Sequence, residues 1–84
     1  MSKTKTHLDR LILIPTDYRW DEMVGLLKLL GYESKAGGKT GGSRRKFINA
    51  DGHIISLHEP HPNKIVKCYV LRQIVITFKE RGIL

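Results

Sequence analysis

The chain has 84 residues and a formal charge of +7, from 15 lysines and arginines against 8 acidic residues. This length fits one domain, and the single cysteine, Cys68, excludes an intramolecular disulfide or a site built from several thiolates. The longest apolar run, Leu11–Pro15, is far shorter than the about 20 residues that cross a bilayer, and Met1–His7 lacks a signal-peptide pattern. We therefore expect a cytoplasmic protein without a membrane partner. Its positive charge indicates a polyanion or an acidic protein as partner, or only a soluble surface.

Residues 1–19 are predicted to form an N-terminal arm, and residues 20–84 the domain itself. Within the arm, His7–Ile14 has enough leucine and isoleucine for a short helix with one apolar stripe, while Met1–Lys5 is expected to be frayed. Pro15 should end that helix, because proline disfavours helical geometry in the residue before it. The arm could fold back on the domain or pair with another chain.

Two longer helices are predicted, over Trp20–Leu30 and Lys67–Arg81. Each contains apolar residues at i, i+3, i+4 and i+7 spacing, which gives one buried face. Gly31 and Gly82 suit the positions that follow the helix ends. A tryptophan at a helix start could stack on a base, but we expect Trp20 to belong to the core.

Three strands are predicted between these helices, over Tyr32–Ala36, Ser43–Asn49 and His53–His58. Gly37–Gly42 should form a loop, and Asn49–Gly52 has the turn chemistry that joins the last two strands in a hairpin. The simplest packing is an α+β fold with a three-stranded antiparallel sheet and the helices on one face. Its order is α-β-β-β-α, with the short helical arm in front.

Alternation along the second strand divides its side chains between two faces. Phe47 should face the helices, and Arg45 should share that side near the open end of the hairpin, where it can reach solvent. Arg44 and Lys46 should then point away from the helices, on a surface open to RNA or to an acidic protein.

Cations are concentrated in Lys39–Lys46, whose sequence is Lys-Thr-Gly-Gly-Ser-Arg-Arg-Lys. Its glycines let a backbone approach closely, and arginine grips phosphate with two parallel hydrogen bonds. The segment is not a P-loop, since the first glycine of that motif is missing and no long helix follows. A solvated strand edge is the alternative to phosphate contact. The predicted RNA-binding residues, which include two lysines near the start of the last helix, are Lys39, Ser43, Arg44, Arg45, Lys46, Lys64 and Lys67.

Two histidines and a glutamate lie in Leu57–Pro62. Without a third strong ligand this is a weak metal signal, so we expect no metal and no cofactor. Imidazole also suits proton transfer near neutral pH. For His58 we favour a structural role in which the ring caps backbone groups, whereas for His61 a structural and a catalytic role are equally open.

The order of several short motifs resembles the HicA-type toxins, the small RNA-cleaving partners of HicA–HicB toxin–antitoxin systems. These motifs are Gly41–Phe47, Asp51-Gly52, His61–Lys64 and Leu71–Ile74, and the resemblance covers roughly residues 20–84. It implies a double-stranded-RNA-binding-like fold. It also implies an mRNA interferase of a type II system, which cleaves RNA and is neutralised by a HicB-like acidic antitoxin.

The family's strand motif is Gly-Ser-His-His-x-Phe, and its first histidine is catalytic. Here Gly42-Ser43 and Phe47 keep that frame, but Arg44 and Arg45 replace the two histidines. Arginine stays protonated and is no ordinary general base, although it can stabilise a phosphorane. The resemblance therefore implies that an arginine holds the phosphate while another histidine activates the 2′-hydroxyl. The catalytic residues implied in this way are Arg44, His61 and His53.

Three functions remain open from the sequence. The first is an RNA endonuclease toxin, which the arginine at position 44 could also have inactivated. The second is a non-catalytic double-stranded-RNA-binding module, which reads RNA shape through phosphates and 2′-hydroxyls. The third is a protein-interaction subunit whose charge serves an acidic antitoxin alone.

Overall fold

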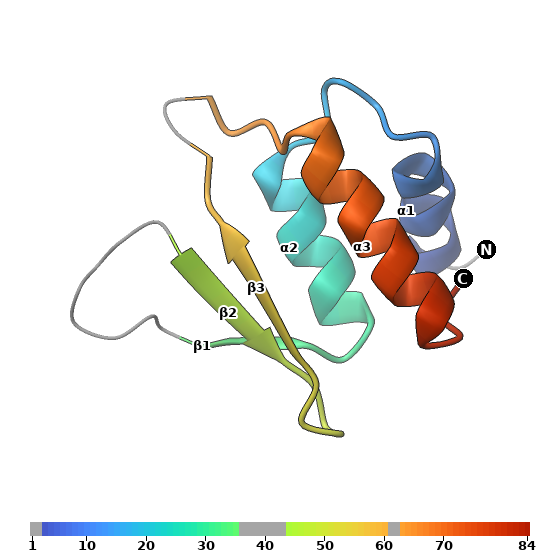
Figure 1. The fold of residues 1–84 in the computed structure, drawn as a ribbon, viewed down its shortest axis with the longest axis vertical. Helices are drawn as coiled ribbons and strands as arrows, with labels where there is room; N and C mark the ends of the chain where they lie inside the picture. The colour runs from blue at the N-terminus through green and yellow to red at the C-terminus, as the bar shows by residue number, and fades with distance from the viewer. Residues whose placement is uncertain (1–2, 36–43, 61–62) are drawn as a thin grey trace.

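Helices and strands follow one another in the order α-α-β-β-β-α in the computed structural model, which describes residues 3–35, 44–60 and 63–84. The sheet forms one layer, α2 and α3 cover one of its faces, and α1 lies beyond these two helices (Figure 1). This confirms the predicted α+β class with helices on one face. No helix in the described ranges is long and apolar enough to span a membrane. The elements are α1 (Lys3–Ile12), α2 (Trp20–Leu29), β1 (Glu33–Lys35), β2 (Arg44–Ile48), β3 (Ile54–His58) and α3 (Cys68–Glu80).

The sheet is antiparallel with strand order β1-β2-β3, so β2 is its central strand. Phe47 lies opposite Ile55 on β3, and both are buried against the helices together with Leu57. On the other face of the hairpin, Lys46 of β2 and Ser56 of β3 are exposed. The predicted alternation is therefore confirmed. The Asn49–Gly52 turn is confirmed as well, because Gly52 has a φ of 85° and its N–H donates to the Asn49 carbonyl.

The core lies between the sheet and the two long helices. Trp20 is only 7% exposed, and its ring centroid lies 6.1 Å from that of Phe47. This confirms the prediction that Trp20 belongs to the core. Its buried ring is not accessible for stacking on a base. The apolar stripes predicted for α2 and α3 are buried here: Met23, Leu26, Leu27, Leu71, Ile74, Val75 and Phe78.

The N-terminal arm folds back on the domain. Leu11 is fully buried, and burial of a leucine side chain contributes about 1.5–3 kcal/mol. The helix begins at Lys3, four residues before the predicted start, so the expectation that Met1–Lys5 is frayed was wrong for Lys3–Lys5. An i,i+4 ion pair between Lys5 and Asp9 supports this added turn. The helix ends at Ile12, two residues before the predicted end at Ile14, and Ile14 itself has a left-handed φ of 49°.

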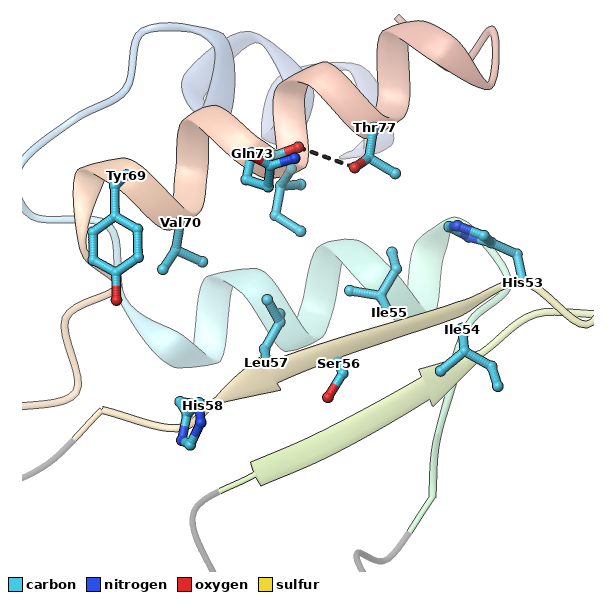
Figure 2. Close-up of a pocket in the computed structure, with 11 residues that line it drawn as sticks. His53, Ile54, Ile55, Ser56, Leu57, His58, Tyr69, Val70, Gln73 and Thr77 are labelled. Carbon is cyan, nitrogen blue, oxygen red and sulfur yellow. Dashed lines mark hydrogen bonds between the residues drawn. The ribbon is translucent and has the colours of Figure 1, made fainter.

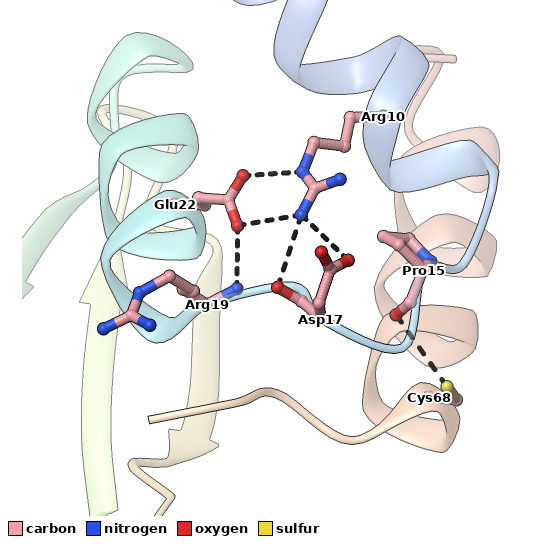
Figure 3. Close-up of polar contacts among 6 residues, drawn as sticks. All are labelled: Arg10, Pro15, Asp17, Arg19, Glu22 and Cys68. Atoms are coloured by element: carbon pink, nitrogen blue, oxygen red, sulfur yellow. Dashed lines mark hydrogen bonds and ion pairs between the residues drawn. The ribbon is translucent and has the colours of Figure 1, made fainter. Parts of the chain in front are cut away.

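Arg10 ties the arm to α2 (Figure 3). Its guanidinium donates to both carboxylate oxygens of Glu22, at 2.6 and 3.2 Å, and to the Asp17 carboxylate at 3.2 Å. The hydrogen bond from Arg10 lowers the pKa of the Glu22 carboxyl below its ordinary value. Glu22 also accepts the Arg19 N–H at 2.8 Å, which satisfies a donor at the helix start. One carboxylate thus orders both the arm and the first turn of α2.

A short antiparallel bridge fixes the segment that leads into α3. Arg19 and Ile65 are its paired residues. The Trp20 N–H donates to the Lys64 carbonyl at 2.7 Å, and the Val66 N–H donates to the Tyr18 carbonyl at 2.7 Å. The start of α3 is therefore held beside the start of α2, close to the end of β3.

Candidate functional site

The outer face of the β2–β3 hairpin, which points away from the helices, brings cations and a histidine together. Arg44 lies opposite His58, and Lys46 lies opposite Ser56. All four side chains are exposed. These residues, together with Lys35 of β1, form the surface called the outer face below.

Arg44 and His58 are in contact at the open end of the hairpin. The Arg44 Nη2 atom is 3.5 Å from the His58 Nε2 atom. Arginine is only a donor, so a hydrogen bond between these atoms requires Nε2 to present its lone pair and the neutral ring to carry its proton on Nδ1. A cation and a proton acceptor therefore stand side by side on an exposed surface.

Lys35 and Lys46 are direct cross-strand partners, one on β1 and one on β2. Like charges that face each other in a sheet are destabilising. Glu33 lies on the same face, two residues before Lys35 and diagonal to Lys46, but among the described residues no ion pair joins it to either lysine, and Lys46 faces Ser56 on its other side. This arrangement favours a bound anion as the group that compensates the two charges.

Arg45 lies on the opposite face, as the alternation predicts. Its Nε atom donates to Glu59 Oε1 at 3.1 Å, and Lys64 Nζ donates to the other oxygen of the same carboxylate. Lys64, and to a lesser extent Arg45, lower the pKa of the Glu59 carboxyl by these hydrogen bonds. The structure therefore separates these two predicted RNA-binding residues from Arg44 and Lys46 and gives both an acidic partner.

The other predicted site residues divide into two groups. Lys67 is exposed at the N-cap position of α3. Lys39, Ser43 and His61 lie outside the described residues, as does the predicted loop Gly37–Gly42.

His53 is placed at the far end of the hairpin from Arg44. It precedes β3, whereas His58 ends that strand, and five residues of extended chain span roughly 16 Å. Figure 2 shows His53 and His58 at opposite ends of the groove between β3 and α3. The Tyr32 hydroxyl lies 2.7 Å from His53 Nδ1. His53 is thus joined to the core and is not brought together with Arg44.

The environment of His53 leads to a pH-dependent prediction. Burial, and secondarily the charge of Arg81, lower the pKa of the His53 imidazole. The unfolded chain then takes up a proton near pH 6.5 while the folded chain does not, so stability is full above that pH and falls below it. We expect the melting temperature of the wild type to drop between pH 7.5 and 5.5, and His53→Asn to reduce that drop.

The matched control for this experiment is His7→Asn in α1. It should keep the pH dependence of the wild type in the same thermal melts. Identical pH profiles for the wild type and His53→Asn would contradict the assigned role of His53.

Two residues of the outer face were missed in the sequence. His58 was placed at the end of the third predicted strand but was given a structural role, and Lys35 was placed in the first predicted strand without a functional role. The signal for His58 was present: Arg44 and His58 are each seven residues from Asp51 of the turn, and antiparallel register pairs residues at equal distances from the turn. Lys35 could not be placed in this way, because its register depends on the loop before β2.

Metal ligands do not gather at this site. In residues 3–35, 44–60 and 63–84, no group of three or more His, Cys, Asp or Glu side chains could hold a metal ion. The outer face itself offers guanidinium, ammonium, imidazole and hydroxyl groups.

An α-β-β-β-α domain whose exposed sheet face presents cations beside a histidine defines a class of small protein suited to a phosphate backbone. Residues 20–83 match the family HicA toxin of bacterial toxin–antitoxin systems. Because the match covers most of the chain, the chain belongs to this RNA-cleaving toxin family. Searches of curated proteins and of solved structures gave no significant match.

Proposed function

We propose that this chain is itself an endoribonuclease and that it cleaves mRNA on the outer face. The observation that carries the proposal is the contact between Arg44 and His58, at 3.5 Å, in a family of RNA-cleaving toxins. Arg44 occupies the position of the family's catalytic histidine and supplies a permanent positive charge. His58 supplies the proton acceptor that Arg44 cannot be.

The two side chains divide the reaction between them. When Arg44 turns from His58 to the phosphate, the lone pair of His58 Nε2 is released; it takes the proton of the ribose 2′-hydroxyl, and the 2′-oxygen forms a bond to the adjacent phosphorus. Arg44 donates to the phosphate oxygens, whose negative charge grows in the pentacoordinate state. The bond from phosphorus to the 5′-oxygen breaks, and that oxygen takes a proton from solvent. The products are a 2′,3′-cyclic phosphate and a 5′-hydroxyl, and no metal takes part.

Lys35 and Lys46 extend the phosphate-binding surface beyond the scissile position. Each phosphate contact contributes about 0.7 to the slope of log K against log salt for single strands. Lys46→Ala should therefore weaken RNA binding and lower that slope by about one contact. Lys79→Ala, at an exposed position in the last turn of α3, is the control and should leave the slope unchanged. Equal slopes for Lys46→Ala and the wild type would remove Lys46 from the interface.

The family implies an antitoxin partner. We propose that this partner is a HicB-like acidic protein that covers the outer face in the cytoplasm and thereby excludes RNA. The cations Lys35, Arg44 and Lys46 give that face the complementary charge.

A second candidate function is RNA binding without cleavage. Arg44 favours it, because the residue that replaces the family's catalytic histidine cannot take a proton. In that case the cations of the outer face would still bind RNA phosphates in the same way.

Induced expression in a bacterial host tests the proposal against this second function. We expect the wild type to arrest growth and to shorten cellular mRNA, and coexpression of the antitoxin to prevent both effects. Arg44→His is the informative comparison. If only Arg44→His arrested growth and cleaved RNA, the wild-type chain would be a binding module and not a nuclease.

A further inference from the structure

The aromatic side chains of this chain fall into two groups by exposure. One tryptophan, three tyrosines and two phenylalanines are present, all within the described residues. Five of these rings are at most 7% exposed, whereas Tyr69 is 66% exposed. Tyr69 precedes the buried Leu71 by two residues, which turns it about 160° away from the core stripe of α3. Its ring is therefore the aromatic surface that the domain offers to a ligand.

Tyr69 lies beside the proposed catalytic pair. It lines a hollow of about 330 Å³ between the end of β3 and the start of α3, a size within the range of small-ligand pockets. Figure 2 shows Tyr69 and His58 at the same end of the groove between β3 and α3. The hollow is lined by His58, Pro60, Val66, Lys67, Tyr69 and Val70.

We infer that this hollow binds one nucleobase of the RNA, next to the phosphate held by Arg44 and His58. This inference rests on the proposed function and names the part of the substrate that its site recognises. A base stacks on an aromatic face through dispersion and electrostatic attraction, in single-stranded RNA especially. The hollow has the apolar wall that such stacking needs, from Val66, Tyr69 and Val70.

His58 gives the inferred base its place along the strand. It contacts Arg44 on the outer face and also lines the hollow, so the two sites share one side chain. A nucleotide bound at the hollow is therefore an immediate neighbour of the cleaved phosphate. Lys67, at the rim, offers a positive charge to a flanking phosphate, and the described residues that line the hollow include no acidic side chain.

The chemistry of the walls favours a base over a bare phosphate. A phosphate could bind Lys67 and His58 but would leave the Tyr69 ring and the apolar side chains of Val66 and Val70 unused. A base uses these apolar walls for stacking. The hollow thus combines a stacking face with polar groups at its rim.

Binding of short RNAs to the full chain tests the inference. The RNAs are 2′-O-methylated throughout, which blocks attack by the 2′-oxygen, and each carries one abasic nucleotide at a successive position. For the wild type we expect one position at which the abasic nucleotide weakens binding. Tyr69→Ala should weaken binding of the intact RNA by about 5- to 100-fold and should abolish the effect of that abasic position.

Two further variants separate stacking from a general loss of structure. Tyr69→Phe keeps the ring face and should bind within about twofold of the wild type. Ile76→Ala removes another exposed α3 side chain, 49% exposed and outside the hollow, and should bind as the wild type does. Circular dichroism of all three variants should show the same helical content.

Several outcomes would overturn the inference. Equal affinity and an equal abasic profile for Tyr69→Ala and the wild type would mean that the hollow binds no base. Weaker capture of the antitoxin by Tyr69→Ala, with RNA binding unchanged, would assign the surface to the protein partner. If the wild type showed the base effect but cleaved no RNA, the proposed cleavage would fail while the hollow kept its assignment. If it bound no RNA at all, both proposals would fail.

Discussion

Replacing His58 by asparagine should slow RNA cleavage by about 10²- to 10⁴-fold, the usual contribution of a positioned general base. Asparagine has similar size and can still contact Arg44 through its side-chain oxygen, but it does not accept the 2′-hydroxyl proton at neutral pH. The melting temperature should change little, because His58 is exposed at the end of β3. Single-turnover cleavage at saturating protein measures this effect without a contribution from product release.

Two other histidine variants make the His58 assignment specific. His53→Asn should cleave at the wild-type rate at pH 7.5, since His53 lies at the other end of β3. His61→Asn tests the other histidine that the sequence proposed as a general base. A large loss of rate in His61→Asn with none in His58→Asn would move the general base from the strand end to that loop.

Replacing Arg44 by alanine should lower the cleavage rate by about 10²- to 10³-fold, the loss typical of one donor to a developing oxyanion. The same variant should bind RNA with a salt slope smaller by about one phosphate contact. Arg44→Lys should recover most of the salt slope but little of the rate, because lysine keeps the charge and loses the two-pronged donor geometry. The comparison of the two variants separates charge from geometry.

An unchanged cleavage rate in Arg44→Ala would contradict the catalytic role of Arg44. If Arg44→Ala cleaved RNA as fast as the wild type, the outer face would bind RNA only at other positions. If its salt slope were also unchanged, Arg44 would have no phosphate contact at all.

Short-range patterns predicted most of the fold. The i, i+3, i+4, i+7 stripes gave α2 and α3, and the two-residue alternation placed Phe47 inward and Arg44 outward, because these patterns depend only on local geometry. Long-range contacts were not predictable in the same way. The pairing of Arg10 with Glu22 depends on the direction in which residues 13–19 turn the arm; Pro15 predicts that the helix ends, but not that the arm folds back onto α2.

The candidate site was predicted in part. Arg44 and Lys46 were assigned to the exposed face correctly, since strand alternation and charge density agree there. Glu59, however, lies near Arg45 and Lys64 only after the hairpin and the loop before α3 have folded, so the sequence could not show that both cations have an acidic partner. The hollow beside Tyr69 likewise forms only when the segment between β3 and α3 has brought the end of the strand beside the start of the helix.

The central claim is that the wild-type chain, with Arg44 in place of the family's histidine, cleaves RNA through the 2′-hydroxyl. The most direct measurement incubates the purified wild type with a labelled RNA in EDTA and identifies the product ends. We expect 2′,3′-cyclic phosphate and 5′-hydroxyl ends, and no cleavage where the nucleotide on the 5′ side of the cut is 2′-deoxy. Intact RNA, or cuts that require a divalent metal and leave 5′-phosphate ends, would contradict it.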